Sequence, residues 1–452
     1  MRFTAIRKVV ALSGAVAMMA GLAACGSTNT TESNQASGEG KQEITVWAWE
    51  PTLEDVVSKF EAKYPDIKVN LQNVGTNKDE YTALTNALEA NSGAPDVAQI
   101  EYYAIPEYAI KGQLKELGEL GAKDYEDYYT PGTWAQVQFN GGIYGLPMDS
   151  GPMAFFYNKE TFDKAGVDAT QIKTWDDYYE AAKKIRALGD KYYITNDAGD
   201  AGFYEAMTWL AGGQPFSTSD GGETVSVNLT GDEGSKKFQE FWQKMIDEDL
   251  IDTKTAGWSE DWNRGLGDGT LASLLIGSWM PANLVGGASA AAGKWRVTTM
   301  PTPDGKPANA EHGGSSLAVV GTTKKAEAAW KFIDFANHDR EGVQARVDGG
   351  AFPADNETME DSDWLSKTTL KDSDDNDVDY FGGQKFNEVL AESAKNVLTG
   401  YQVLPYAVAS RGVFNDNVGG AYTGQETLEQ GIQKWQDKIV ELGKSQGFTV
   451  KE

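Results

Sequence analysis

Apolar and polar positions alternate in two different rhythms along residues 43–100 of this chain. Residues 43–49 and 67–71 alternate from one position to the next and are rich in β-branched side chains, which predicts strands. Residues 51–64 and 79–90 carry apolar side chains every three or four positions, which predicts amphipathic helices. A third strand is predicted at 96–100. Alternating strands and helices indicate an α/β unit with a largely parallel sheet, and such sheets bind ligands beyond the carboxyl ends of their strands.

Residues 144–166 combine several kinds of element in a short stretch. Gly and Pro at 145–147 predict a loop, and residues 149–152 form a polar turn. The apolar run 153–157 is too short for a typical helix and predicts a buried strand. Asn158 then predicts the N-cap of a helix. This succession indicates that the chain crosses here from one folded unit into another.

The same patterns continue to the C-terminus, without an internal repeat. Helices are predicted at 175–188 (with Thr174 as its N-cap), 203–210, 234–249 and 325–336, and from residue 386 onward most of the chain is predicted to be helical. Residues 258–269 predict a helix and a turn. Strands are predicted at 271–276, 295–300 and 313–320.

The N-terminus is predicted to be a targeting segment. Basic side chains within residues 2–8 precede the apolar stretch 9–20, which is short for a membrane span. Residues 22–26, Leu-Ala-Ala-Cys-Gly, resemble a bacterial lipobox, which implies cleavage after a signal peptide of residues 1–24 and lipidation, such as palmitoylation, of Cys25. Since Cys25 is the only cysteine, a disulfide within the chain and a metal centre ligated by cysteines are excluded.

Composition narrows the class of protein further. Residues 25–42 are almost free of apolar side chains and predict a flexible tether. The chain of 452 residues is long enough for two domains, and its hydrophobic content of 40% can fill their cores. The formal net charge of -27 argues against binding of nucleic acid or broad adsorption to anionic lipid, because both require a basic surface. The negative charge does not argue against a neutral ligand.

Catalytic motifs are scarce. The chain has two histidines, His312 and His338, and contains no HExxH, phosphate-binding GxxxxGK[ST] or GxSxG motif. The acidic segment 372–379 does not fit the spacing of a calcium loop, so we interpret it as a solvated loop. A glycoside hydrolase, which uses a pair of carboxylates, remains an alternative. Because the chain has 67 Asp and Glu residues, the presence of such a pair in the sequence does not distinguish this alternative. We predict no enzyme activity, no cofactor and no metal.

The segment that begins at residue 147 resembles the signature of carbohydrate-type extracellular solute-binding proteins, the capture subunits of ABC importers and relatives of maltose-binding protein. The matching residues are Pro147, Met148, Asp149, Ala154, Phe155, Phe156, Tyr157, Asn158, Phe162 and Lys164. Other landmarks of the family include Gly277-Ser278-Trp279, Gly313-Gly314-Ser315 and Phe381-Gly382-Gly383.

The resemblance implies a periplasmic-binding-protein-like (class II) fold, in which two α/β lobes are joined by hinge crossovers. Breaks in the pattern at 149–150, 300–303 and 349–353 suit such crossovers. The predicted lobes are therefore residues 43–149 with 302–352, and residues 150–301 with 353–452.

Aromatic side chains supply the positive evidence for a sugar ligand. Sugars stack their C–H faces on aromatic rings and need carboxylates, amides or Arg for their hydroxyls. Among the 13 Trp residues, those in loops at strand ends are the candidates, whereas Trp242, Trp330 and Trp435 on helices are predicted core residues. The family resemblance favours Trp279 for stacking and Asp149 as a cleft carboxylate. The full predicted ligand set is Trp279, Asp149, Trp49, Glu50, Tyr103, Trp262, Trp258, Trp209, Tyr401 and Arg411. His312 is interpreted as a hydrogen-bonded neighbour of the hinge.

These patterns together predict a monomeric solute-binding protein that captures an oligosaccharide between its lobes and delivers it to the transmembrane subunits of an ABC sugar importer. Lipid at Cys25 would hold it on the extracellular face of the cell membrane, as in Gram-positive bacteria. A secreted glycoside hydrolase, or a surface glycan adhesin or sensor without transport, remain the alternatives.

Overall fold

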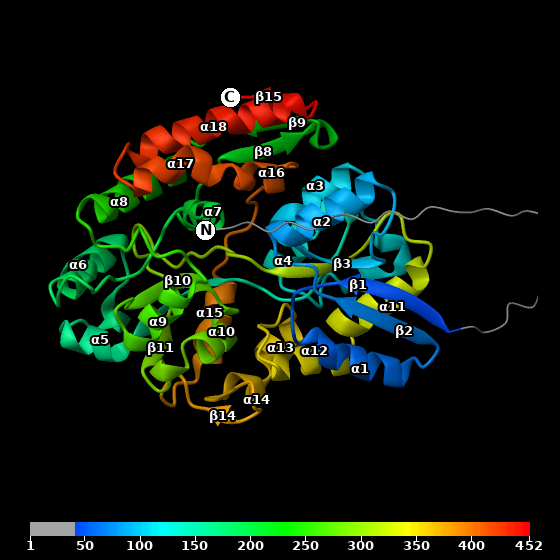
Figure 1. Ribbon diagram of the computed structural model, residues 1–452, viewed down its shortest axis with the longest axis horizontal. Helices are drawn as coiled ribbons and strands as arrows, with labels where there is room; N and C mark the ends of the chain where they lie inside the picture. The colour runs from blue at the N-terminus through cyan, green and yellow to red at the C-terminus, as the bar shows by residue number, and fades with distance from the viewer. Residues whose placement is uncertain (1–40) are drawn as a thin grey trace, which may run out of the picture. The chain divides into compact units, whose positions relative to one another are not determined.

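A computed structural model describes residues 41–452 (Figure 1). The predicted signal peptide, the lipidation at Cys25 and nearly all of the tether lie outside the described residues. Strand β1 (Gln42–Trp47) begins directly after them, at the last residue of the predicted tether. Within residues 41–452, no helix has both the length and the apolar character needed to span a bilayer.

The first sheet has five strands in the order β2-β1-β3-β12-β6. Its strands are β1, β2 (Ile67–Gln72), β3 (Val97–Glu101), β6 (Leu146–Pro147) and β12 (Ser315–Val319). Strand β1 pairs in parallel with β2 and β3, as predicted. Strand β12 runs antiparallel to β3 and β6, because the chain returns to this sheet from the second sheet.

Amphipathic helices cover this sheet and complete its core. They are α1 (Leu53–Lys63), α2 (Lys78–Glu89), α3 (Ile105–Ile110), α4 (Pro131–Gln136), α11 (Ala326–Asn337) and α12 (Arg340–Asp348). The apolar faces of α1 and α11 meet where the ring of Phe60 contacts Phe332 edge-to-face, with centroids 5.2 Å apart. The stripe of Ala328, Phe332 and Phe335 is buried, so its prediction as core is confirmed.

The second sheet is built around β7 (Met153–Asn158), which lies between β10 (Ser273–Gly277) and β11 (Trp295–Thr298) and runs antiparallel to both. Every residue of β7 is buried, because helices cover both faces, which explains its continuous apolar run. Asn158 then caps α5 (Lys159–Lys164) by accepting the backbone N–H of Thr161 at 3.2 Å. Both the predicted strand and the predicted cap are confirmed.

The helices around the second sheet are mostly those that the sequence predicts. They are α6 (Trp175–Arg186), α7 (Ala201–Leu210), α8 (Glu233–Asp247), α9 (Glu260–Asp268), α10 (Met280–Gly287), α15 (Phe386–Lys395), α16 (Ala407–Gly412), α17 (Phe414–Tyr422) and α18 (Leu428–Ser445). Thr174 caps α6 through a capping box, as predicted. The core Trp residues Trp242 and Trp435 are fully buried, whereas Trp330 is half-buried and stacks on Tyr125.

Several short elements are absent from the sequence-based prediction. Strands β8 (Phe216–Ser219), β9 (Thr224–Val227) and β15 (Thr449–Lys451) form a small sheet that joins the C-terminus to the middle of the chain. Further examples are α13 (Asn356–Glu360), α14 (Ser362–Leu365) and the two-residue strands β4 (Gln138–Phe139), β5 (Gly142–Ile143), β13 (Leu370–Lys371) and β14 (Asp377–Val378). Helices α3, α4, α10 and α12 are also absent from the prediction, and the predicted loop at 145–147 contains β6, because Leu146 pairs with β12.

Two crossing segments lie side by side between the sheets and form a hinge. The chain leaves the first sheet after β6 and returns before β12, and Pro152 and Glu311 form an antiparallel bridge between these segments. The backbone N–H of His312 donates to the carbonyl of Gly151 at 2.7 Å. The Glu311 carboxylate accepts the N–H of Gly151 at 2.5 Å and the hydroxyl of Ser150 at 3.1 Å.

Candidate functional site

The carboxyl ends of β1 and β3 bring the first group of predicted ligand residues together. Trp49 and Glu50 follow β1, and Tyr103 lies just beyond β3. The side-chain oxygen of Gln99, within β3, accepts the backbone N–H groups of Trp49 and Glu50, each at 3.0 Å. These bonds hold the loop after β1 against β3, so Trp49, Glu50 and Tyr103 lie at the same edge of the sheet.

Carboxylates converge at these strand ends. Asp149, on the hinge, accepts the backbone N–H of Ser315 at 2.5 Å. Burial raises the pKa of Asp149 to about 7, and the nearby carboxylates of Glu50 and Glu101 add to this rise. Burial likewise raises the pKa of Glu101 to about 7, against the opposing effect of the Arg411 guanidinium. We call Glu50, Glu101 and Asp149 the acidic side of the site.

Glu101 is held in one orientation by its neighbours. Its carboxylate accepts the side-chain amide of Asn77 at 2.6 Å and the hydroxyl of Tyr81 at 3.2 Å. Tyr103 in turn donates its hydroxyl to Asn77 at 3.1 Å. These contacts order the acidic side before any ligand arrives, which reduces the entropy that a ligand must offset.

Three tryptophans of the second region form an aromatic platform, defined here as Trp258, Trp262 and Trp279. Trp258 is 57% exposed, the one large hydrophobic residue so exposed within residues 41–452, and it has a φ of 67°, a conformation rare for a bulky side chain. Its ring stacks on Trp279 with centroids 5.7 Å apart and packs on Trp262 at 5.0 Å. The Trp279 indole N–H donates to the His312 carbonyl at 2.8 Å, which attaches the platform to the hinge.

The remaining predicted residues gather around α7. Trp209 is buried and stacks on Tyr401 with centroids 4.7 Å apart. The guanidinium of Arg411 donates to the Glu205 carboxylate through Nη2 at 2.6 Å and Nε at 3.1 Å. It also lies 3.7 Å from the centroid of the Tyr103 ring, so it touches both α7 and the end of the first sheet.

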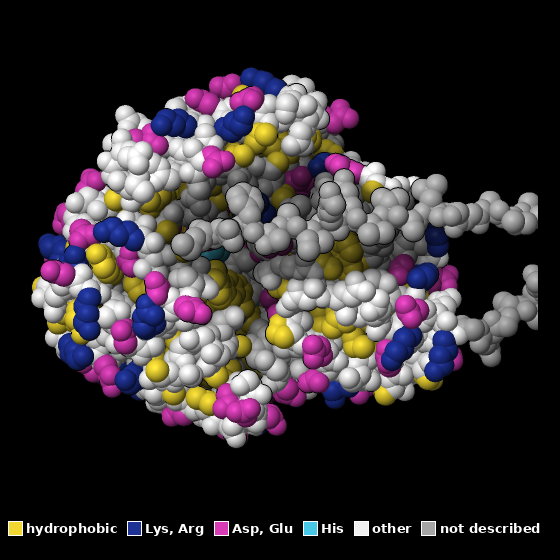
Figure 2. Space-filling view, viewed as in Figure 1, with side chains coloured by type: hydrophobic (Ala, Val, Ile, Leu, Met, Phe, Trp, Pro, Cys, Tyr) yellow, Lys and Arg dark blue, Asp and Glu magenta, His cyan; other side chains and the backbone are white. Residues whose placement is uncertain are grey.

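The charge of Arg411 acts on Glu101, and Trp279 bonds to His312 of the hinge, so the acidic side, α7 and the platform adjoin one another; we call the space between them the cleft. Figure 2 shows this face hollowed between the two sheets, with hydrophobic side chains gathered in the hollow. One small cavity of about 30 Å³ in the cleft is lined by Tyr103, Glu205, Trp209, Tyr401 and Arg411 together with glycines of the hinge. It has room for about one water molecule.

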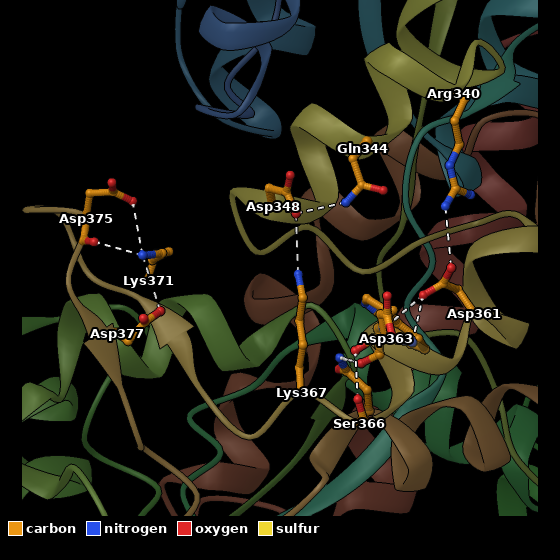
Figure 3. A network of polar contacts seen from close by, with 12 residues as sticks. Arg340, Gln344, Asp348, Asp361, Asp363, Ser366, Lys367, Lys371, Asp375 and Asp377 are labelled. Carbon is orange, nitrogen blue, oxygen red and sulfur yellow. Dashed lines mark hydrogen bonds and ion pairs between the residues drawn. The ribbon is translucent and has the colours of Figure 1, made fainter.

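A larger cavity of about 360 Å³ lies elsewhere, between α12, α14, α15 and the β13–β14 hairpin. Its rim carries the ion pairs seen in Figure 3, in which Lys367 lies 3.4 Å from Asp348, and Lys371 lies 3.2 Å from Asp377 and 3.6 Å from Asp375. None of the predicted ligand residues lines this cavity. Because its charges already pair with one another, we place the candidate site in the cleft despite the smaller volume there.

The same contacts hold the acidic segment 372–379 beside Lys371. Lys371 donates to the backbone carbonyl of Asp375 at 3.0 Å and pairs with the carboxylates of Asp375 and Asp377, so it offsets part of the negative charge of the loop. Within residues 41–452, no group of three or more His, Cys, Asp or Glu side chains is arranged to hold a metal ion.

Several polar residues of the cleft were missed by sequence reasoning. Glu101 stands beside Tyr103 at a strand end, a position that could have identified it. Glu205 lies on α7 and Asp200 is its N-cap, and neither stands at a strand end. His312 is a hydrogen-bonded neighbour of the hinge, as predicted, but through its backbone: within the described residues the buried Nδ1 of its ring has no partner.

The fold and the hinged cleft define a protein that binds a solute between two lobes. The chain belongs to the bacterial extracellular solute-binding protein family, whose model matches residues 47–341. The predicted family and the predicted periplasmic-binding-protein-like fold are therefore confirmed.

Individual relatives are similar over most of the chain. The ABC transporter associated binding protein from B. animalis subsp. lactis Bl-04, solved in complex with β-1,6-galactobiose, is 60% identical with a TM-score of 0.85, covering 91% of this chain and 100% of that one. The galacto-N-biose-/lacto-N-biose I-binding protein from Bifidobacterium longum, in complex with lacto-N-biose, is 25% identical with a TM-score of 0.78, covering 91% and 100%. An arabinooligosaccharide-binding protein of Bacillus subtilis is 28% identical over 68% of this chain and 72% of its own length.

Proposed function

We propose that this protein captures a galactose-containing disaccharide or short oligosaccharide, with β-1,6-galactobiose as the first candidate, and delivers it to an ABC importer. The observation that carries the proposal is the pairing of the exposed Trp258 and the half-buried Trp279 with half-buried carboxylates across one cleft. Identity of 60% over the whole length of a galactobiose-bound relative supports the choice of sugar.

Each side of the cleft suits one part of a sugar. The faces of Trp258 and Trp279 offer stacking area for the C–H face of a pyranose ring. The carboxylates of Glu50, Glu101 and Asp149 accept hydrogen bonds from hydroxyls. Trp49, Tyr103, Trp262, Trp209, Tyr401 and Arg411 complete the proposed ligand set.

Binding between the lobes explains how capture is signalled. A ligand that touches both sides of the cleft stabilises the conformation in which the sides approach, so binding shifts the population toward this closed state. We propose that the transmembrane subunits of the importer recognise the closed state, and that a lipid on Cys25 keeps the monomeric protein at the extracellular face of the membrane.

The proposal is tested by thermal unfolding of residues 25–452 with a panel of neutral disaccharides and trisaccharides. A ligand at 100 times its Kd stabilises the native state by about 2.7 kcal/mol, which raises the Tm by several degrees. β-1,6-Galactobiose is expected to give the largest shift among the disaccharides and to be recovered unchanged after incubation. No shift with any sugar would refute the proposal, and release of galactose would favour a hydrolase.

A further inference from the structure

Helix α7 presents one face to the cleft. Gly202, Glu205 and Trp209 recur at the three- and four-residue spacing that places side chains on the same side of a helix. Glu205 and Trp209 line the small cavity, so this face points into the cleft. Asp200 is the N-cap of the helix, and its Oδ1 accepts the backbone N–H of Phe203 at 3.0 Å.

Three polar atoms meet above Gly202. A Cβ placed on Gly202 would lie 3.2 Å from Asp200 Oδ1, 3.4 Å from Arg411 Nη1 and 3.6 Å from His312 Nε2. These atoms come from the start of α7, from the hinge and from α16, so only the folded chain assembles them. A side chain at position 202 would occupy the space that they share.

The groups around this space retain free hydrogen-bonding capacity. Within residues 41–452, Arg411 donates to protein through Nη2 and Nε, while Nη1 has no hydrogen-bond partner. The buried Nδ1 of His312 also lacks a partner among these residues. Burial lowers the pKa of His312, against the effect of the Asp200 carboxylate, so its imidazole is neutral near pH 7 and offers one donor and one acceptor.

Arg411 and His312 are each held in place by neighbouring groups. Two hydrogen bonds join the guanidinium of Arg411 to Glu205, whose side chain is 4% exposed, and its Cζ lies over the ring of Tyr103, 3.7 Å from the centroid. His312 is fixed by its backbone, which bonds to Gly151 and accepts the indole N–H of Trp279. Groups ordered in this way bind a ligand without a further loss of side-chain entropy.

We propose that Asp200, His312 and Arg411 form a subsite above Gly202 that binds one hydroxyl group of the captured sugar. A hydroxyl both donates and accepts, which matches a carboxylate, a guanidinium and a neutral imidazole around one point. Glu205 acts as a positioning residue because it orients Arg411, and Tyr103, itself in the proposed ligand set, packs against the same guanidinium. The inference deepens the proposed function and rests on it.

The subsite is tested with Gly202→Ala and β-1,6-galactobiose by isothermal titration calorimetry. The added methyl displaces the hydroxyl from its charged partners, so affinity is expected to fall on the order of 10- to 100-fold. Ala is favoured over Gly in a helix, and this gain offsets the close approach of the new Cβ to Asp200 Oδ1 at 3.2 Å, so the Tm should stay near that of the wild type. Gly419→Ala on α17 is the matched control, since a Cβ there meets nothing within 4 Å, and its affinity should not change.

Monodeoxy analogues of galactobiose identify the hydroxyl. The wild type should lose affinity for one analogue at this position, and Gly202→Ala should bind that analogue and the parent sugar equally well. The subsite would be overturned if Gly202→Ala bound the sugar as tightly as the wild type does. It would also be overturned if the substitution weakened the binding of every analogue by the same factor, because the added methyl would then block the cleft in general. If the wild type binds no sugar of the panel, the proposed function and the subsite both fail.

Discussion

The acidic side of the cleft and the aromatic platform differ in how the fold holds them. The backbone of Glu50 donates to Gln99 of β3, Glu101 accepts from Asn77 and Tyr81 at the start of α2, and Asp149 accepts from Ser315 of β12, so hydrogen bonds hold all three half-buried residues. Trp258, by contrast, is held by packing alone on two other indoles and remains more than half exposed. The acidic side is therefore suited to select hydroxyl positions, and the platform to supply contact area that tolerates different sugars.

The largest effect is expected from Trp279→Ala, because this side chain belongs both to the platform and to the hinge. Loss of the stacking face should weaken sugar binding at least tenfold. Loss of the indole hydrogen bond to His312 and of the packing should lower stability by about 3 kcal/mol. Titration calorimetry and urea unfolding measure the two effects.

Trp258→Ala is the control that separates these effects. Its exposed side chain packs on the indoles of Trp262 and Trp279 and makes no hydrogen bond within residues 41–452, so affinity should fall while stability stays within about 0.5 kcal/mol of the wild type. Equal affinity of Trp279→Ala and wild type would remove the platform from the site.

A smaller effect on affinity is expected from Asp149→Asn on the acidic side. The amide oxygen can still accept the N–H of Ser315, so the hinge should remain intact. Removing the charge eases repulsion from Glu50 and Glu101, and stability above pH 7 should stay equal or rise. Loss of a charged acceptor for a hydroxyl should weaken binding about tenfold. Unchanged affinity would mean that Asp149 serves the hinge and not the ligand.

The smallest effect is expected in the pH dependence of the stability of the sugar-free protein. Burial raises the pKa of Glu311 to about 7, well above its value in the unfolded chain. Between pH 5 and 8 the folded state therefore binds more protons at this group than the unfolded state, and this contribution to stability falls as pH rises. Glu311→Gln should raise the Tm relative to wild type at pH 8 more than at pH 5. A difference that is independent of pH would contradict the buried, titrating carboxyl.

The sequence predicts those elements whose local pattern and tertiary environment agree. The run 153–157 and the cap at Asn158 are such cases, because burial on both faces and a local hydrogen bond are encoded in neighbouring residues. The small sheet of β8, β9 and β15 is missed because its short strands include many polar residues and pair with the distant C-terminus.

The site was predictable only in part, for a similar reason. Strand ends and loop tryptophans carry local signals, which led to Trp49, Glu50 and Trp279. The convergence of Asp200, His312 and Arg411 above Gly202 depends on segments that meet only in the folded chain. Glu205 and Arg411 are 206 positions apart, and no spacing rule connects them.

We propose that a sugar binds between the acidic side and the aromatic platform, and a crystal structure of the protein with β-1,6-galactobiose would show whether it does. We predict one pyranose ring stacked on Trp258 or Trp279, with hydroxyls within hydrogen-bond distance of at least one carboxylate among Glu50, Glu101 and Asp149. A sugar bound instead in the cavity between α12 and the β13–β14 hairpin, or in contact with only one side of the cleft, would contradict it.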